Sequence, residues 1–191
     1  MVKPAQEDPR QVLYNAYREV PKHQRAEIID GTLYVSPRPA PRHANATSVL
    51  GGELNGAFQR GRGGPGGWWI LFEPELQIVT LEPMVPDLAG WRMERMPALP
   101  ETAYFPIAPD WICEVLSKST EAVDRSKKLP IYAAQGVRHV WLIDPIAMIL
   151  EAHALGDNHR WREVRVYEGS ARAHVEPFAA IELDLGALWA P

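Results

Sequence analysis

Residues 109–120 of the chain read PDWICEVLSKST, and this stretch decides the fold. Residues 111–116 form an apolar run of strand length, in which every second side chain points to the same face. Glu114 therefore lies between Ile112 and Leu116 on one face. A lone carboxylate among apolar neighbours costs free energy unless it is protonated, paired or bound to a metal. Glu114 is thus a candidate functional residue.

A second carboxylate stands in a comparable place. Asp87 lies early in the apolar segment VPDLA, and Pro86 favours a strand start or an edge position. Either acid alone would more often face solvent or pair with a base. If the two strands are neighbours, Asp87 and Glu114 converge at one end of the sheet. With a backbone carbonyl they then offer hard oxygen ligands, which suit Mg²⁺ or Mn²⁺ rather than zinc.

The composition sets limits on fold and function. The 191 residues fit one domain, residues 1–191, and 46% are hydrophobic, so a substantial core can form. The 20 basic and 24 acidic side chains give a net charge of −4, so contact with nucleic acid would need local basic clusters. The one cysteine, Cys113, excludes an internal disulfide and a zinc site built from several cysteines. No signal peptide or membrane-spanning stretch is apparent, which predicts a cytoplasmic protein without membrane contact.

The N-terminal half shows recognisable turns and one long helix. A short helix is expected within residues 1–26, and residues 27–35 indicate a hairpin that turns at Asp30-Gly31. The Pro-rich residues 37–41 break regular structure, after which the apolar spacing of residues 43–60 predicts a helix. The sequence predicts strands at residues 68–72, 75–79, 85–91, 111–116, 137–144, 148–154 and 161–167.

A second helix is expected between two of these strands. Ser119 or Thr120 can cap it, and it runs to Gln135 before Gly136. Pro130 within it predicts a kink or a late start. The succession of strands, helix and strand favours an α/β fold with a mixed sheet.

The chain resembles a known family at an ordered series of segments. It is similar to the Uma family of restriction endonucleases, a branch of the PD-(D/E)XK nuclease superfamily. The matching segments are residues 27–31, 36–43, 86–88, 109–120, 124–132 and 136–145. The resemblance implies a restriction-endonuclease-like mixed central sheet flanked by helices.

The resemblance also implies a set of site residues. Asp87 and Glu114 are the metal-binding acids, and Glu27 is similar to the extra acid that many such nucleases place near the metal. The ordinary motif has a lysine two residues after the glutamate, where this chain has Leu116. Lys128 on the following helix matches the lysine that the family offers instead.

Lys128 could instead have a purely structural role, and its neighbour Lys127 could supply the catalytic charge. Asp124 and Lys128 are four residues apart and share a helix face, so they could simply form a surface ion pair. Lys127 is the fallback for the catalytic charge. His43 could approach the site or simply begin the helix, and we expect it to be structural or peripheral. We expect Tyr132 and Trp141 to be core residues.

The expected partner is DNA. Four bases against two acids give residues 118–128 a charge of 4 − 2 = +2, sufficient for phosphate contacts. A second basic rim is expected at Arg38, Arg42, Arg60 and Arg62.

Three hypotheses follow from these observations. The first is a Mg²⁺- or Mn²⁺-dependent endonuclease that cuts DNA, with Asp87, Glu114 and Lys128 as its catalytic residues. The family resemblance suggests a homodimer, in which two copies pair two single-strand cuts. The second is a nuclease-like domain that no longer cuts and binds nucleic acid or a protein partner. The third is a structural homo-oligomer whose carboxylates are incidental.

Overall fold

A six-stranded sheet forms the centre of the molecule, as described by a computed structural model for residues 8–189. Its spatial order is β10-β9-β8-β7-β6-β3. The strands are β3 (Trp68–Phe72), β6 (Leu88–Arg92), β7 (Trp111–Val115), β8 (His139–Asp144), β9 (Ile149–Leu155) and β10 (Trp161–Glu168). β7 and β8 are parallel, whereas the other neighbouring pairs are antiparallel. The predicted mixed sheet is confirmed.

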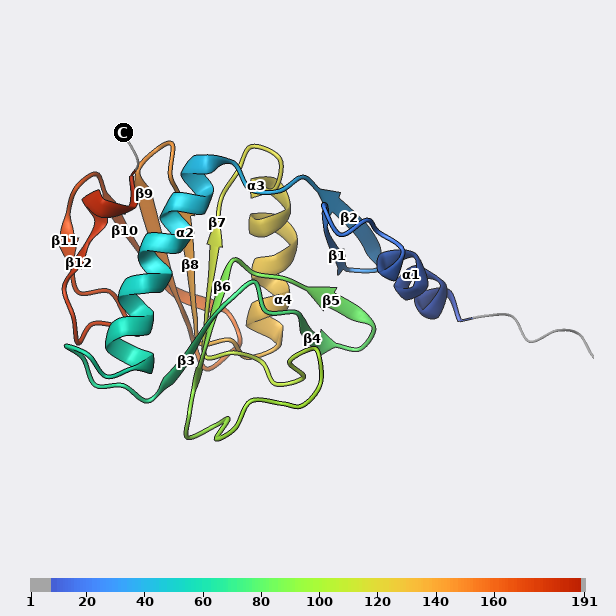
Figure 1. The fold of residues 1–191 in the computed structure, drawn as a ribbon, viewed down its shortest axis with the longest axis horizontal. Coiled ribbons are helices and arrows are strands. Elements are labelled where there is room, and N and C mark those ends of the chain that lie inside the picture. Colours follow the sequence, from blue (N-terminus) through green and yellow to red (C-terminus); the bar gives the residue numbers. More distant parts are fainter. Residues whose placement is uncertain (1–7, 190–191) are drawn as a thin grey trace, which may run out of the picture.

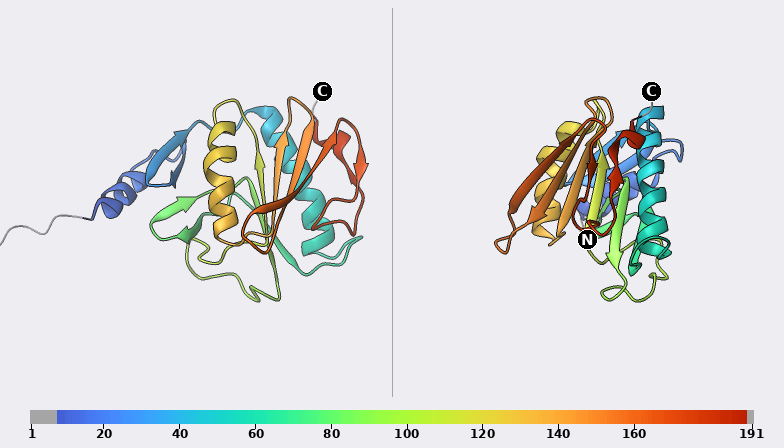
Figure 2. Two further views of the ribbon diagram at one scale, coloured as in Figure 1. Left: turned by 180° about the vertical axis from the view of Figure 1, so that it is seen from behind. Right: turned by 90° about the vertical axis from the view of Figure 1, so that its left-hand side faces the viewer.

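Helices cover both faces of this sheet, as the edge-on view shows (Figure 2). One face carries α2 (Pro41–Leu54), which continues into the π-helical turn η1 (Asn55–Gln59). The other carries α3 (Glu121–Val123), the π-helical turn η2 (Asp124–Lys128) and α4 (Leu129–Ala134), which follow one another without a break. This second helix connects β7 to β8, as a parallel strand pair requires.

The core consists of two apolar layers, one on each side of the sheet. Trp111 and Trp141 lie on the α2 side and meet edge-to-face, with ring centroids 5.2 Å apart. Ile112 and Leu116 belong to the layer beneath α4. The alternation expected for β7 is therefore confirmed, and Trp141 is a fully buried core residue as predicted.

A smaller unit lies at one end of the molecule (Figure 1). It contains α1 (Pro9–Arg18) and the antiparallel hairpin of β1 (Arg25–Ile29) and β2 (Thr32–Ser36). Asp30 and Gly31 have positive φ angles of 52° and 67°, as the favoured two-residue hairpin turn requires. The early helix and the Asp-Gly hairpin are both confirmed.

The segment before Asp87 differs from its prediction. The strand expected at residues 75–79 is β4 (Leu76–Val79), which pairs with an unpredicted short strand, β5 (Glu82–Met84), in a separate hairpin. The strand expected at residues 85–91 is the central strand β6, which begins only at Leu88. Asp87 therefore precedes its strand instead of lying inside it. Pro86 explains this shift, because a residue without an N–H cannot continue a hydrogen-bonded ladder.

The helices also differ in detail. α2 begins at Pro41, two residues earlier than expected, because a proline at the first helical position loses no hydrogen bond. The predicted kink at Pro130 is replaced by η2, whose wider turn ends just before that residue. Three short C-terminal elements were not predicted: β11 (Arg172–Ala173), β12 (Leu183–Asp184) and the 3₁₀ helix η3 (Leu185–Leu188). Within residues 8–189, no helix is long and apolar enough to span a membrane.

Candidate functional site

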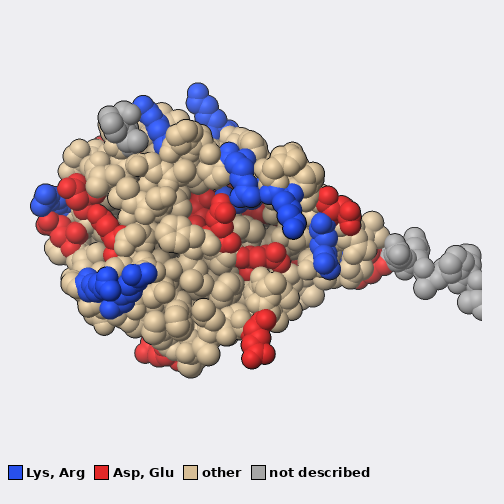
Figure 3. Space-filling model, viewed as in Figure 1, with Lys and Arg blue, Asp and Glu red and all other residues tan. Residues whose placement is uncertain are grey.

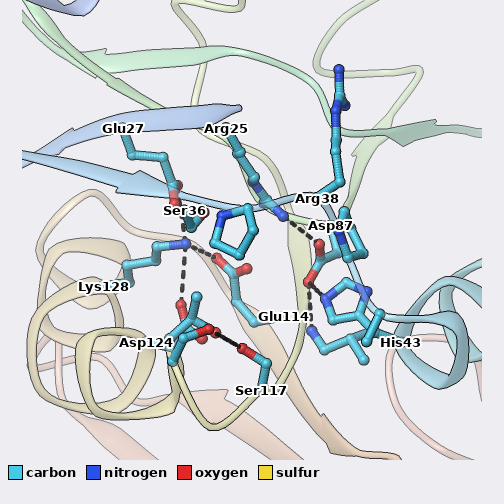
Figure 4. Close-up of a pocket in the computed structure, with 16 residues that line it drawn as sticks. Arg25, Glu27, Ser36, Arg38, His43, Asp87, Glu114, Ser117, Asp124 and Lys128 are labelled. Atoms are coloured by element: carbon cyan, nitrogen blue, oxygen red, sulfur yellow. Dashed lines mark hydrogen bonds and ion pairs between the residues drawn. The ribbon is translucent and has the colours of Figure 1, made fainter. Parts of the chain in front are cut away.

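Charged side chains from four separate segments line one pocket of about 140 Å³ (Figure 4). The pocket lies where β7 ends, between the start of α2 and the helix that follows β7. Four carboxylates and three permanent cations line it: Glu27, Asp87, Glu114, Asp124, Arg25, Arg38 and Lys128. The structure thus brings together every site residue expected from the sequence.

Asp87 is held through both carboxylate oxygens. Its Oδ1 accepts a hydrogen bond of 2.7 Å from Nη1 of Arg25. Its Oδ2 accepts from the backbone N–H of Val115 at 2.7 Å and lies 3.2 Å from Nε2 of His43. Burial pushes the pKa of Asp87 up, but the His43 hydrogen bond and the Arg25 charge outweigh it and hold the pKa at about 2. Asp87 is therefore ionised at neutral pH.

Glu114 lies in the same pocket as Asp87 but has different hydrogen-bond partners. Its Oε1 accepts hydrogen bonds from the Tyr132 hydroxyl at 2.6 Å and from Nζ of Lys128 at 3.3 Å. Burial raises the pKa of Glu114 to about 8, because the nearby Lys128 charge only partly offsets it and the other carboxylates add to it. Two acids in one pocket thus differ strongly in proton affinity.

Lys128 links three carboxylates in the interior. Its Nζ lies 3.0 Å from Glu27 Oε1, 3.1 Å from Asp124 Oδ1 and 3.3 Å from Glu114 Oε1. Burial alone would lower the pKa of Lys128, but the three carboxylates raise it well above its ordinary value. The side chain is 3% exposed and remains charged.

The two lysines of η2 point in different directions. Lys128 and Asp124 form a buried pair, so the alternative of a surface ion pair is wrong. Lys127 is exposed and pairs with Asp30 at 2.9 Å, outside the pocket. Of these two lysines, Lys128 is the one that lines the pocket.

Glu27 ties the N-terminal hairpin to the segment that carries Asp87. Its Oε1 contacts Lys128 and also accepts the backbone N–H of Val85 at 2.8 Å. Arg25 on the same strand donates to the Val85 carbonyl oxygen as well as to Asp87. Strand β1 thereby fixes both the acid and the backbone just before it.

Three residues near the acids had not been predicted to act there. His43 was expected to be structural or peripheral, but it contacts Asp87. Tyr132 is buried as predicted, yet its hydroxyl binds Glu114. Arg25 gave no signal in the sequence, because its role depends on a contact with a residue far along the chain.

The expected second basic rim is only partly correct. Arg38 lines the pocket. Arg60 and Arg62 lie beyond the far end of α2 and η1, roughly 27 Å from its start at 1.5 Å per residue. These two arginines are therefore too distant to contact a phosphate bound at the acids.

The donor set suits a hard divalent cation. Among residues 8–189, no group of three histidine, cysteine or acidic side chains surrounds a common metal position. Mg²⁺ commonly binds through only one or two carboxylates and keeps several waters, so Asp87 and Glu114 are the residues that could hold it. When all are ionised, the four carboxylates outnumber the cations Arg25, Arg38 and Lys128 by one.

Comparison with known proteins agrees with this class of fold, a mixed sheet flanked by helices as in restriction-endonuclease-like proteins. The chain belongs to the Uma2 family, described as "Putative restriction endonuclease", whose sequence profile matches residues 13–186.

A solved structure shows the same fold. It is the crystal structure of "a putative nuclease belonging to DUF820" from Anabaena variabilis ATCC 29413, with a TM-score of 0.74 and 22% sequence identity. The match covers 92% of this chain and 96% of that one. No match was found among curated proteins.

Proposed function

We propose that the chain is a Mg²⁺-dependent endonuclease that hydrolyses DNA phosphodiester bonds within a single nuclease-like domain, with Mn²⁺ as an alternative metal. Asp87 and Glu114 bind the metal, and Lys128 assists the reaction. One observation carries the proposal: Glu114 on β7 and Asp87, just before the adjacent β6, line one pocket beside a buried lysine 3.3 Å from Glu114. The family description supports a nuclease.

The protein side chains divide the work of such a reaction. When bound, the metal polarises a phosphoryl oxygen and lowers the pKa of a coordinated water. Lys128 supplies a fixed positive charge that can orient water or stabilise charge on the phosphate. Asp124 and Glu27 hold this ammonium in place, and Tyr132 fixes the orientation of Glu114.

Leu116 explains why the lysine comes from the helix. The position belongs to the apolar layer beneath α4, and its side chain is almost fully buried. A lysine there would have to bury its charged ammonium beside apolar groups, which costs free energy. Lys128 reaches the same end of β7 from η2, where Asp124 one turn earlier supports it.

Glu27 is the least direct member of the proposed metal site. Its Oε1 is shared between Lys128 and the Val85 N–H, so it contributes to the metal through its remaining oxygen or through a water. The same residue positions Lys128 in the absence of metal.

A second candidate is a nuclease-like domain that binds nucleic acid or a protein partner without cutting. The specific observation in its favour is that both oxygens of Asp87 already have protein partners, Arg25 on one side and His43 with Val115 on the other. A metal must share this carboxylate with Arg25 or displace it.

A homodimer belongs to the same proposal, because cutting both strands of a duplex needs two sites. Strand β10 is an edge of the sheet, with Val164 and Val166 each about half exposed. We propose this exposed apolar edge as the surface where two copies pair. Sedimentation equilibrium tests it, and a monomer at all concentrations would contradict it.

Plasmid cleavage tests the proposed activity. Wild-type protein should nick supercoiled DNA in Mg²⁺ and stop when EDTA is added. Asp87→Asn and Glu114→Gln, purified in parallel, should lose cleavage. Cleavage that persists in Asp87→Asn would indicate a contaminating nuclease, while metal binding without cleavage would favour the second candidate.

A further inference from the structure

An open groove continues from the acid pocket toward α1. It has a volume of about 440 Å³ and shares Arg25 and Arg38 with the pocket. Its walls come from the end of α1, the connection to β1 and the segment before β4. The two hollows therefore form one continuous surface, with the acids at one end.

Three exposed bases line or border this groove, and we call them the basic rim: Arg18, Lys22 and Arg38. Figure 3 shows a row of Lys and Arg side chains that runs from the middle of the face toward α1, with Asp and Glu side chains beside it. No hydrogen bond or ion pair within the described residues engages the side chains of Arg18 and Lys22. Arg38 donates to the Lys22 carbonyl oxygen at 2.9 Å and lies 3.9 Å from Glu73.

The electrostatics of the pocket makes such a rim necessary. Four carboxylates against the two buried cations Arg25 and Lys128 leave an acidic excess when all are ionised, and the third cation that lines the pocket, Arg38, belongs to the rim. A phosphodiester is itself an anion, so the pocket alone repels the substrate that it is proposed to cut. Positive charge that captures the backbone must lie just outside the acids, where the basic rim lies.

We propose that the basic rim binds the phosphate backbone of DNA next to the scissile bond, so that the strand enters the acid pocket from the α1 side. This inference rests on the proposed function for its choice of ligand. It assigns the rim to affinity rather than to base recognition, because exposed Arg and Lys side chains contact phosphates without reading sequence. Arg38, which lines both hollows, marks the passage from rim to pocket.

A charge-reversal pair tests the rim against a matched control. Arg18→Glu with Lys22→Glu changes the net charge by −4, and so does Arg60→Glu with Arg62→Glu. All four side chains are exposed, so both variants should melt as the wild type does. Binding of a short fluorescent duplex is measured by anisotropy with EDTA present, so that no strand is cut and the result does not depend on activity.

The rim variant should bind the duplex at least about tenfold more weakly at low salt. Its plot of log K against log salt should flatten by about 0.9 for each lost phosphate contact, close to 2 in all. The control variant should stay near wild type. Equal weakening of both variants, or a wild type that binds no DNA, overturns the proposal. If DNA binding depends on the basic rim but the protein never cuts DNA, the rim proposal stands and the nuclease proposal is rejected.

Discussion

Replacing Lys128 by methionine should destabilise the protein strongly, because three buried carboxylates would lose their common cation. The ammonium contacts Glu27, Asp124 and Glu114 within 3.3 Å and is nearly inaccessible to solvent. Removing one partner of a buried ionic cluster costs roughly 3–5 kcal/mol. For a domain of this size, such a loss lowers the melting temperature by at least about 6 °C.

Urea unfolding followed by tryptophan fluorescence measures this loss, since Trp91, Trp111 and Trp141 are fully buried. Lys127→Met is the matched control: the same substitution one residue earlier, at an exposed side chain, should leave the midpoint unchanged. The penalty in Lys128→Met should shrink at lower pH, where the stranded carboxylates take up protons. Equal stability of the two variants at neutral pH would refute the assignment of Lys128 as the centre of the cluster.

Three further outcomes are expected. Tyr132→Phe removes a hydroxyl that donates a hydrogen bond to the buried Glu114, so it should lower the free energy of unfolding by about 1.5–3 kcal/mol. An unchanged urea midpoint would show that this hydrogen bond does not stabilise the fold. Burial, aided by nearby arginines, lowers the pKa of His139 to about 4. The unfolded chain therefore binds more protons between pH 6.5 and 4, and wild-type stability should fall by up to roughly 3 kcal/mol as the pH drops through this window. His139→Gln should flatten that fall in pH-dependent melting, and an identical slope would contradict it. Arg25→Met leaves Asp87 without its cation, so it should lower stability in EDTA and recover more stability than wild type when Mg²⁺ is added. Equal Mg²⁺-induced melting shifts would show that Arg25 does not compete with the metal.

The strands and hairpins that sequence reasoning found are those whose signals are local. The Asp30-Gly31 turn needs only two residues that tolerate a positive φ angle, and both residues adopt one. Strand β7 was recognisable from the run around Glu114, and the alternation of its side chains between the two apolar layers followed. The sequence did not predict β5, because a strand of three residues carries almost no periodicity.

The site residues also divide into those that the sequence indicated and those that only the fold reveals. Asp87 and Glu114 were recognised as carboxylates in apolar segments, Lys128 was added by the family resemblance, and the structure brings all three into one pocket. Arg25 and His43 were missed in this role because each meets Asp87 only through tertiary contacts. Their types offer no clue, since an arginine in a hairpin strand and a histidine in a first helical turn are ordinary features. Only the fold shows that both face the same carboxylate.

Calorimetric titration of Mg²⁺ or Mn²⁺ into wild-type protein and Glu114→Ala tests the central claim most directly. The pocket should bind metal in the wild type through Asp87 and Glu114, and the Glu114→Ala variant should lose that binding while remaining folded by circular dichroism. Metal binding of equal affinity and stoichiometry in Glu114→Ala would contradict the assignment of this pocket as the metal site.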